Sequence, residues 1–293
     1  MSAPAHRLPA PTEFLVTEET FALWQSLAAF PADQTEAALR HLQEWLARKI
    51  AADNVIWVGA VRVIDGPAAR DDPFSGWRLR ARRPLQPDSA AYRRLLAGYY
   101  APDHNGKLTP AFHDRSHDER RDAHVGMPGR ASLAGAGRFR VHRLRDGWID
   151  FVAFKRTLHY QLYYRDQGIV DRMTIGFPAT PDAESFLLID RQGPRRRPFT
   201  AREAALAGGA ARGIPELHRR LFLTHGLFTG DRPLSPAARE ILHGLLSGLS
   251  EKEIAARIGQ RPATLHKYVT ALYTRHRVKS RAALMAQWLG RTS

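Results

Sequence analysis

Apolar residues near the start of the chain recur at helical spacing in two segments. The first runs from Phe21 to Ala29 and carries Trp24 and Leu27, and the second runs from Thr35 to Ile50. Apolar residues three and four positions apart lie on one face of a helix. Each segment therefore predicts an amphipathic helix that packs by one side.

The period changes after residue 53. The segment Asn54–Ile64 is rich in β-branched and aromatic residues, and Trp77–Arg83 alternates between apolar and basic residues. Such segments form β-strands, whose successive side chains point to opposite faces. The basic positions of the second strand, expected to face solvent, are Arg78, Arg80 and Arg82. The spacing over Ala90–Tyr100 predicts another helix.

Residues 102–138 are polar, rich in Gly, His and Asp, and have no sustained period, which predicts a long loop. After this loop, four short apolar segments separated by turn residues predict strands. They cover residues 148–154, 160–164, 171–177 and 185–190. Between the second and third, Asp166-Gln167-Gly168 is typical of a hairpin turn.

A helical pattern over Thr200–Leu227 closes this part of the chain, with Thr200 as its N-cap and Glu203 at the third position. Helices, antiparallel strands and a closing helix predict an α+β domain over residues 12–225. The arrangement resembles PAS/GAF-like sensory domains. Residues 226–233 are then expected to be a linker, followed by a helical domain over residues 234–293.

The sharpest local signals lie in this second domain. Ser250 and Glu253 are spaced as a capping box, in which each residue bonds the backbone of the other. Gly259 supplies the left-handed residue that ends a helix, and Pro262 suits the first position of the next one. The inward stripe of that next helix is Leu265, Val269, Leu272 and His276. Two helices joined by a tight turn are typical of proteins that place a helix in the major groove of DNA.

Spaced positions across the last 60 residues support a more specific interpretation. They are Leu234-Ser235-Pro236, Ile241-Leu242, Gly248-Leu249-Ser250, Lys252-Glu253-Ile254-Ala255, Gly259, Thr264-Leu265, Val278 and Ser280-Arg281. In these positions the segment resembles the LuxR-type (GerE-like) helix-turn-helix domain, an all-α four-helix domain of transcriptional regulators. The departures are Ala238 for a common Glu, Arg261 for the usual cap of the recognition helix, and Tyr268 and His276 for a common His and Leu.

The resemblance implies a set of residues that contact double-stranded DNA. Base contacts fall on His266, Lys267 and Thr270, of which Lys267 can donate to guanine. Phosphate contacts, which position the protein without reading sequence, fall on Thr264, Tyr268, Lys252, Arg275 and Lys279. The last helix of the family is often a dimer contact, here through Leu284, Met285 and Trp288. The alternative, that this apolar stripe only closes the core of the small domain, remains open.

Charge agrees with a nucleic-acid partner. The chain of 293 residues has a net charge of +15. Its last 60 residues hold ten Lys and Arg residues against three Glu, a net charge of +7. A basic segment on a less basic body is the electrostatic footprint of a protein that binds a polyanion. A generally Arg-rich composition would give a similar charge, so charge alone does not decide.

Composition excludes several kinds of site and argues against a membrane-spanning segment. There is no cysteine, so disulfides and thiolate metal sites are excluded. The longest apolar run, Val55–Val61, is too short to span a bilayer, and the start of the chain lacks the apolar core of a signal peptide. We therefore expect a soluble, cytoplasmic protein that has no membrane contact.

Two features of the sequence are compatible with a metal site or a ligand pocket but do not require either. Four histidines with several aspartates lie in the polar loop, at His104, His113, His117 and His124. Solubility explains such a loop better than metal binding, so we expect no metal. The aromatic residues of the body suit a pocket for a small molecule, although ordinary core packing explains most of them.

No catalytic motif emerges, so the sequence predicts neither an enzyme nor a cofactor. It predicts a dimeric transcriptional regulator whose N-terminal domain senses a small molecule or a partner, with RNA polymerase as a further candidate partner. Two alternatives remain. The N-terminal domain could be a dimerisation or docking module without a ligand, or the chain could be an enzyme or carrier whose helical tail does not bind DNA.

Overall fold

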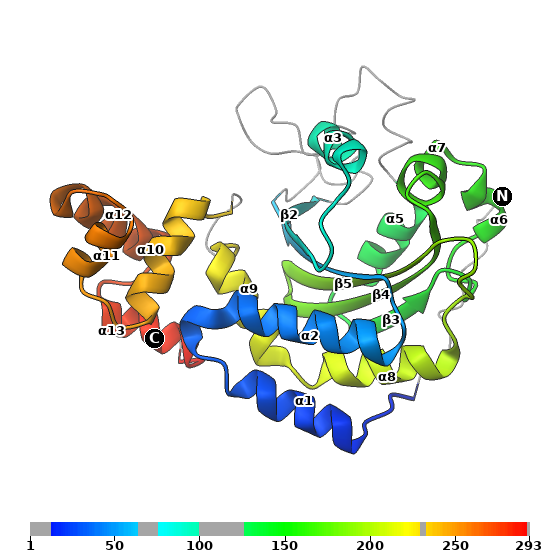
Figure 1. Cartoon of the computed structure of the whole chain (residues 1–293), viewed down its shortest axis with the longest axis horizontal. Coiled ribbons are helices and arrows are strands. Elements are labelled where there is room, and N and C mark those ends of the chain that lie inside the picture. The colour runs from blue at the N-terminus through cyan, green and yellow to red at the C-terminus, as the bar shows by residue number, and fades with distance from the viewer. Residues whose placement is uncertain (1–12, 64–75, 100–125, 229–232, 292–293) are drawn as a thin grey trace.

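The computed structural model describes residues 13–63, 76–99, 126–228 and 233–291. Its centre is a five-stranded antiparallel sheet in the order β2-β1-β5-β4-β3 (Figure 1). The strands are β1 (Asn54–Arg62), β2 (Trp77–Pro84), β3 (Arg140–Arg143), β4 (Ile169–Thr180) and β5 (Ala183–Gln192). The predicted α+β body with an antiparallel sheet is confirmed.

One face of the sheet is covered by helices from both ends of the body. They are α1 (Glu18–Ala28), α2 (Thr35–Lys49), α8 (Ala201–Arg212) and α9 (Pro215–His225), with η1 (Ala32–Gln34) between the first two. Leu39, Leu42 and Leu46 recur at helical spacing on α2 and pack against Trp57 and Leu187 of the sheet. This face holds the larger apolar core.

The opposite face carries shorter helices, α3 (Ala90–Tyr99), α5 (Met127–Ala134), α6 (Phe151–Lys155), α7 (Leu158–Tyr160) and the π-helical turn η4 (Gln161–Arg165). The core on this side is aromatic, with Phe154, Tyr163 and Tyr164 against Phe186. The body is thus a sandwich of helices, sheet and helices.

Four further helices form the C-terminal part, as the sequence predicts. They are α10 (Pro236–Leu246), α11 (Glu251–Arg257), α12 (Pro262–Arg275) and α13 (Arg281–Trp288). They enclose a small core of their own, built on Leu242, Leu265 and Leu284. No helix among the described residues is long and apolar enough to cross a bilayer.

Two predicted strands are wrong. Residues 148–154 and 160–164 instead contain α6, α7 and η4. Asp150 and Thr157 accept hydrogen bonds from the amides of Ala153 and Tyr160, and these side-chain caps start helices where aromatic content favours strands. The turn at Gly168 therefore joins η4 to β4 rather than two strands.

The predicted helix over Thr200–Leu227 is two helices. Gly213 and Ile214 separate α8 from α9, and Pro215 begins α9. A Cβ on Gly213 would lie 2.0 Å from the ring of Trp24, so the break also admits the indole of α1. The cap by Thr200 and Glu203 is present as predicted.

The polar segment of residues 102–138 was predicted as one long loop, which is wrong for its final part because α5 lies there. The short strand β3 was not predicted. The basic face of β2 is not solvated either, since Arg78 and Arg80 are only 3% and 7% exposed. The histidine cluster at residues 104–124 lies outside the described residues.

Candidate nucleic-acid interface

The turn between α11 and α12 is fixed by local bonds. Ser250 Oγ accepts from the Glu253 amide at 3.3 Å, and the Glu253 carboxylate accepts from the Ser250 amide at 2.7 Å. Interaction with Ser250 lowers the pKa of Glu253, which keeps this cap charged. Gly259 adopts φ +66°, the left-handed conformation that ends α11. Local bonds and the conformation of Gly259 thus fix where α11 begins and ends.

The helix α12 is held by one apolar stripe. Leu265, Val269 and Leu272 are buried in the C-terminal core, while His266 and Lys267 on the other side are exposed. The helix begins without a side-chain cap at Arg261, as the sequence predicts. Its polar face is therefore presented to solvent along its length.

The three predicted base-contacting residues share this exposed face. His266 is held by Glu251 of α11, whose Oε2 lies 3.0 Å from Nδ1. Thr270 donates its hydroxyl proton to the carbonyl of His266 at 3.0 Å, so its oxygen lone pairs remain for an outside donor. Lys267 is exposed, like the other two. A patch of one cation and two short polar side chains results.

The predicted phosphate-contacting residues divide into two groups. Lys252 and Lys279 are exposed, Tyr268 is 51% exposed, and Thr264 is half-buried. Arg275 differs, because it is half-buried and donates to the carbonyl of Gly226 at 3.1 Å. The structure thus directs Arg275 toward the end of α9, where sequence spacing gave no sign of a partner.

The helix α13 turns most of its apolar stripe inward. Leu284 and Trp288 are buried in the C-terminal core, while Met285 is 39% exposed. Beside Trp288, burial lowers the pKa of His276 to about 4, so this histidine stays neutral at ordinary pH. Of the three predicted dimer residues, Met285 is the one available at the surface.

The C-terminal helices contact the body through η1, where Ala32 packs against their core, and through α9. Leu223 of α9 packs into the C-terminal core rather than that of the body. Arg219, from the same helix, donates to the carbonyls of Gln287 and Trp288 at the end of α13. The sequence pattern did not identify Leu223 and Arg219 as contacts between α9 and the C-terminal helices. The apolar pattern of α9 shows which positions are buried but not which core buries them.

A charged cluster lies at the end of α9, which also contacts the C-terminal helices. Arg83 Nε of β2 is 3.2 Å from Glu36 of α2, and His225 Nε2 of α9 is 3.1 Å from the same carboxylate oxygen. Burial alone would raise the pKa of Glu36, but these two neighbours outweigh it and lower the pKa to about 2. Burial lowers the pKa of His225. Trp57 stacks on the imidazole at 5.2 Å between ring centroids.

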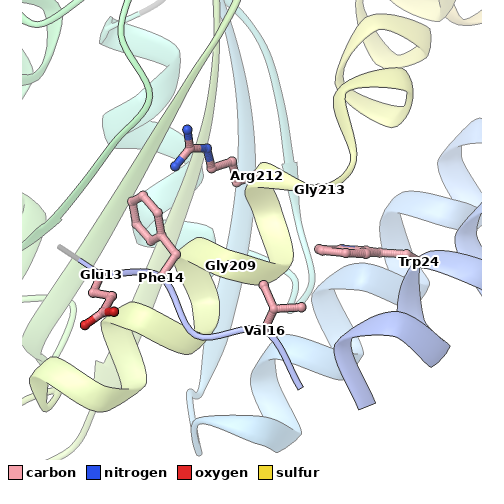
Figure 2. Close-up of a pocket in the computed structure, with 7 residues that line it drawn as sticks. All are labelled: Glu13, Phe14, Val16, Trp24, Gly209, Arg212 and Gly213. Carbon is pink, nitrogen blue, oxygen red and sulfur yellow. The ribbon is translucent and has the colours of Figure 1, made fainter. Parts of the chain in front are cut away.

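A surface cleft of about 510 Å³ lies between residues 13–16, α1 and the end of α8 (Figure 2). Its charged side chains, Glu13 and Arg212, are exposed, and Arg212 lies over the ring of Phe14. The indole N–H of Trp24 is already bonded to the carbonyl of Ala210. Among the residues lining this cleft, none is a buried polar group that would orient a ligand.

The chain is 35% identical over 97 residues to the "Probable HTH-type transcriptional regulator GfsR" of Streptomyces halstedii. The match spans 31% of this chain and 39% of that protein, so the chain covers about two fifths of the relative's length. No protein-family model matches the chain.

Two solved structures of SdiA align over most of the chain. One is SdiA in complex with octanoyl-rac-glycerol, with 12% identity over 94% of this chain and 96% of that one. The other is Escherichia coli SdiA, with 13% identity over 93% and 97% of the two chains. Both have a TM-score of 0.38, a value at which they decide neither the fold nor the ligand of this chain.

Proposed function

We propose that this protein is a DNA-binding transcriptional regulator rather than an enzyme, and that α12 is its reading helix. The exposed polar face of α12 supports this proposal, because it leaves His266, Lys267 and Thr270 accessible on a helix of fixed orientation. In the major groove, Lys267 would donate to guanine N7 or O6. Such a regulator acts in the cytoplasm, with RNA polymerase as its expected partner.

Paired variants test this placement. Lys267→Ala should shift the sequence preference and cost about 1–3 kcal/mol at one base pair if its contact there is lost. Lys279→Ala, at a phosphate-contacting position, should weaken all sequences alike. Both preferences are measured by selection from random DNA at one salt concentration. An unchanged preferred site for Lys267→Ala would contradict the assignment of α12.

The regulator is proposed to act as a homodimer on a two-fold-related site. A single small helix-turn-helix unit makes few phosphate contacts, so pairing two units is the usual route to useful affinity. The exposed Met285 on α13 suits such a contact. The sensory domain then comprises residues 12–225, the linker 226–233 and the DNA-binding domain 234–293.

We further propose that the body controls the DNA-binding helices through α9. Leu223, Arg219 and the Arg275–Gly226 bond support this, because a shift of α9 would move α13 and the end of α12 with it. An effector that binds one arrangement better than another would shift the population by its differential affinity.

Arg219→Ala tests this control. It should change the DNA affinity of the full chain, because it releases the end of α13 from α9. Arg202→Ala, an exposed arginine on α8, is the matched control with the same loss of charge. Equal affinities for both variants and the wild type at equal salt would mean that the contact between α9 and α13 does not control DNA binding.

A further inference from the structure

The side chain of Arg140 in the body is buried and closely packed on several sides. Arg140 of β3 lies on the sheet face that carries α3 and α5, with its guanidinium 5.2 Å from the ring of Phe186. A Cβ on Gly176 of β4 would lie 2.6 Å from Cζ, so the group rests directly on the neighbouring strand. The side chain is only 7% exposed. Its plane therefore cannot turn freely.

The hydrogen bonds of this guanidinium are all on one side. Nη1 donates to Glu184 Oε2 and to the carbonyl of Arg138, both at 2.8 Å. The other oxygen of Glu184 accepts from the amide of Gly137 at 2.6 Å. Nε and Nη2 are buried, and no described residue accepts from either. These two nitrogens form one edge of the guanidinium, whose parallel N–H bonds match the two oxygens of a carboxylate.

A second arginine on the same face, Arg172, has the corresponding edge paired with a carboxylate. Arg172 of β4 donates from Nε and Nη2 to the two oxygens of Asp190, at 2.6 and 2.7 Å. Asp190 fills the edge of Arg172, while Glu184 takes only the opposite side of Arg140. A buried donor left unpaired destabilises the fold, and more so when the group is charged. Arg140 therefore has a buried, unpaired edge that an outside acceptor can stabilise.

Two more buried polar groups lie on the elements around Arg140. The hydroxyl of Ser132 on α5 and Nδ1 of His142 on β3 have no hydrogen-bond partner within the described ranges. Burial and the charge of Arg140 lower the pKa of His142 to about 4, so the ring adds no charge at neutral pH. Burial is the main cause that lowers the pKa of Arg140; the charge of Glu184 opposes this effect and that of Arg138 adds to it.

We propose that the body binds the carboxylate of a small acidic effector at the Nε–Nη2 edge of Arg140. This inference rests on the proposed sensory function and names the chemical class of its ligand, an alkyl or aryl carboxylic acid. The apolar part of that acid would meet the aromatic side chains of this layer, among them Phe186 and Trp148.

The geometry also couples binding to a movement. Gly135 at the end of α5 contacts the stem of Arg140, because a Cβ there would lie 2.9 Å from Cδ. Since both donor atoms are buried, a carboxylate reaches them only when neighbouring groups move, including this end of α5. Occupancy would therefore select one position of α5 over another.

Benzoate and benzamide are the matched probes, because they share a ring and differ in the carboxylate. With the full-length wild-type chain, benzoate should shift the Arg140 Nε–H resonance, and benzamide at the same concentration should leave it unmoved. Arg140→Lys keeps the charge beside Glu184 but removes the bidentate edge. It should bind benzoate about 10-fold to 100-fold more weakly, the range expected for losing charged hydrogen bonds.

Equal response to the two probes, or an unshifted Arg140 resonance while benzoate binds elsewhere, would overturn the proposal. If Arg140→Lys fails to fold, the response of the wild-type Arg140 resonance to benzoate and benzamide still tests the proposal. DNA binding measured on the same preparation separates the two hypotheses. A chain that binds DNA but ignores benzoate at Arg140 contradicts only the ligand class, whereas a chain that binds no DNA contradicts the regulator itself.

Discussion

Replacing Glu36 by Gln removes one charge from the cluster that joins α2, β2 and α9 while keeping the size of the side chain. In the wild type, the pKa of this carboxyl is lowered to about 2 from its ordinary 4.5. Because the folded state holds the charged form more strongly than the unfolded state, Glu36 stabilises the fold above pH 4.5. That contribution is lost as the pH falls toward 2.

A pKa lowered this far corresponds to about 3 kcal/mol of stability at pH 7. Two facts reduce this figure. His225 is neutral at pH 7 because burial lowers its pKa, so Arg83 supplies the full positive charge. Glu36 is also 32% exposed, and solvent screens its interactions. We therefore expect Glu36→Gln to cost about 1–2 kcal/mol at pH 7.

Urea unfolding followed by circular dichroism measures this difference. At pH 3.5 roughly half of it should be gone, because the unfolded carboxyl is by then mostly protonated. Glu44→Gln on the same helix is the control, since its pair with Arg40 is 41% and 65% exposed and is expected to contribute little. An equal cost of Glu36→Gln at pH 7 and pH 3.5 would refute the electrostatic explanation.

Three further predictions concern the C-terminal helices. Ser250→Ala should lower the free energy of unfolding by about 0.5–2 kcal/mol, because α11 loses its cap, and calorimetry would show no change if the cap were unimportant. Leu223→Ala should cost about 2–5 kcal/mol and should mainly destabilise the C-terminal helices, into whose core this α9 residue packs; chemical denaturation that affects only the body would contradict this. Sedimentation of the protein–DNA complex should give two chains per duplex, and a stable complex of one chain on a full site would exclude the dimer.

The parts that the sequence predicted are those decided by neighbouring residues. The capping box of Ser250 and Glu253, the turn at Gly259 and the start at Pro262 each act within a few positions, so α11 and α12 could be located in advance. The same holds for β4 and β5, which are short apolar segments bounded by turn residues. Local caps at Asp150 and Thr157 were equally readable, but the aromatic residues around them favoured the strand interpretation.

What the sequence did not predict depends on distant partners. Nothing near Arg78 or Arg80 indicates that both side chains are buried, because the residues that bury them lie elsewhere in the chain. Arg140 meets Glu184, which is 44 residues away. Arg219 meets the end of α13, 68 residues away. Such contacts follow from the packing of the sheet and helices, and spacing along the chain gives no sign of them.

The dependence of DNA affinity on salt tests the central claim most directly. Full-length protein is titrated onto a duplex selected from random DNA, at several salt concentrations between about 50 and 200 mM. If α12 enters the groove with Lys252, Lys267 and Lys279 near phosphates and bases, the logarithm of affinity should fall steeply and linearly with the logarithm of salt concentration. Affinity for an unrelated duplex should be at least about 1,000-fold weaker at the same salt. Equal affinity for both duplexes, or no dependence on salt, would contradict a sequence-reading regulator.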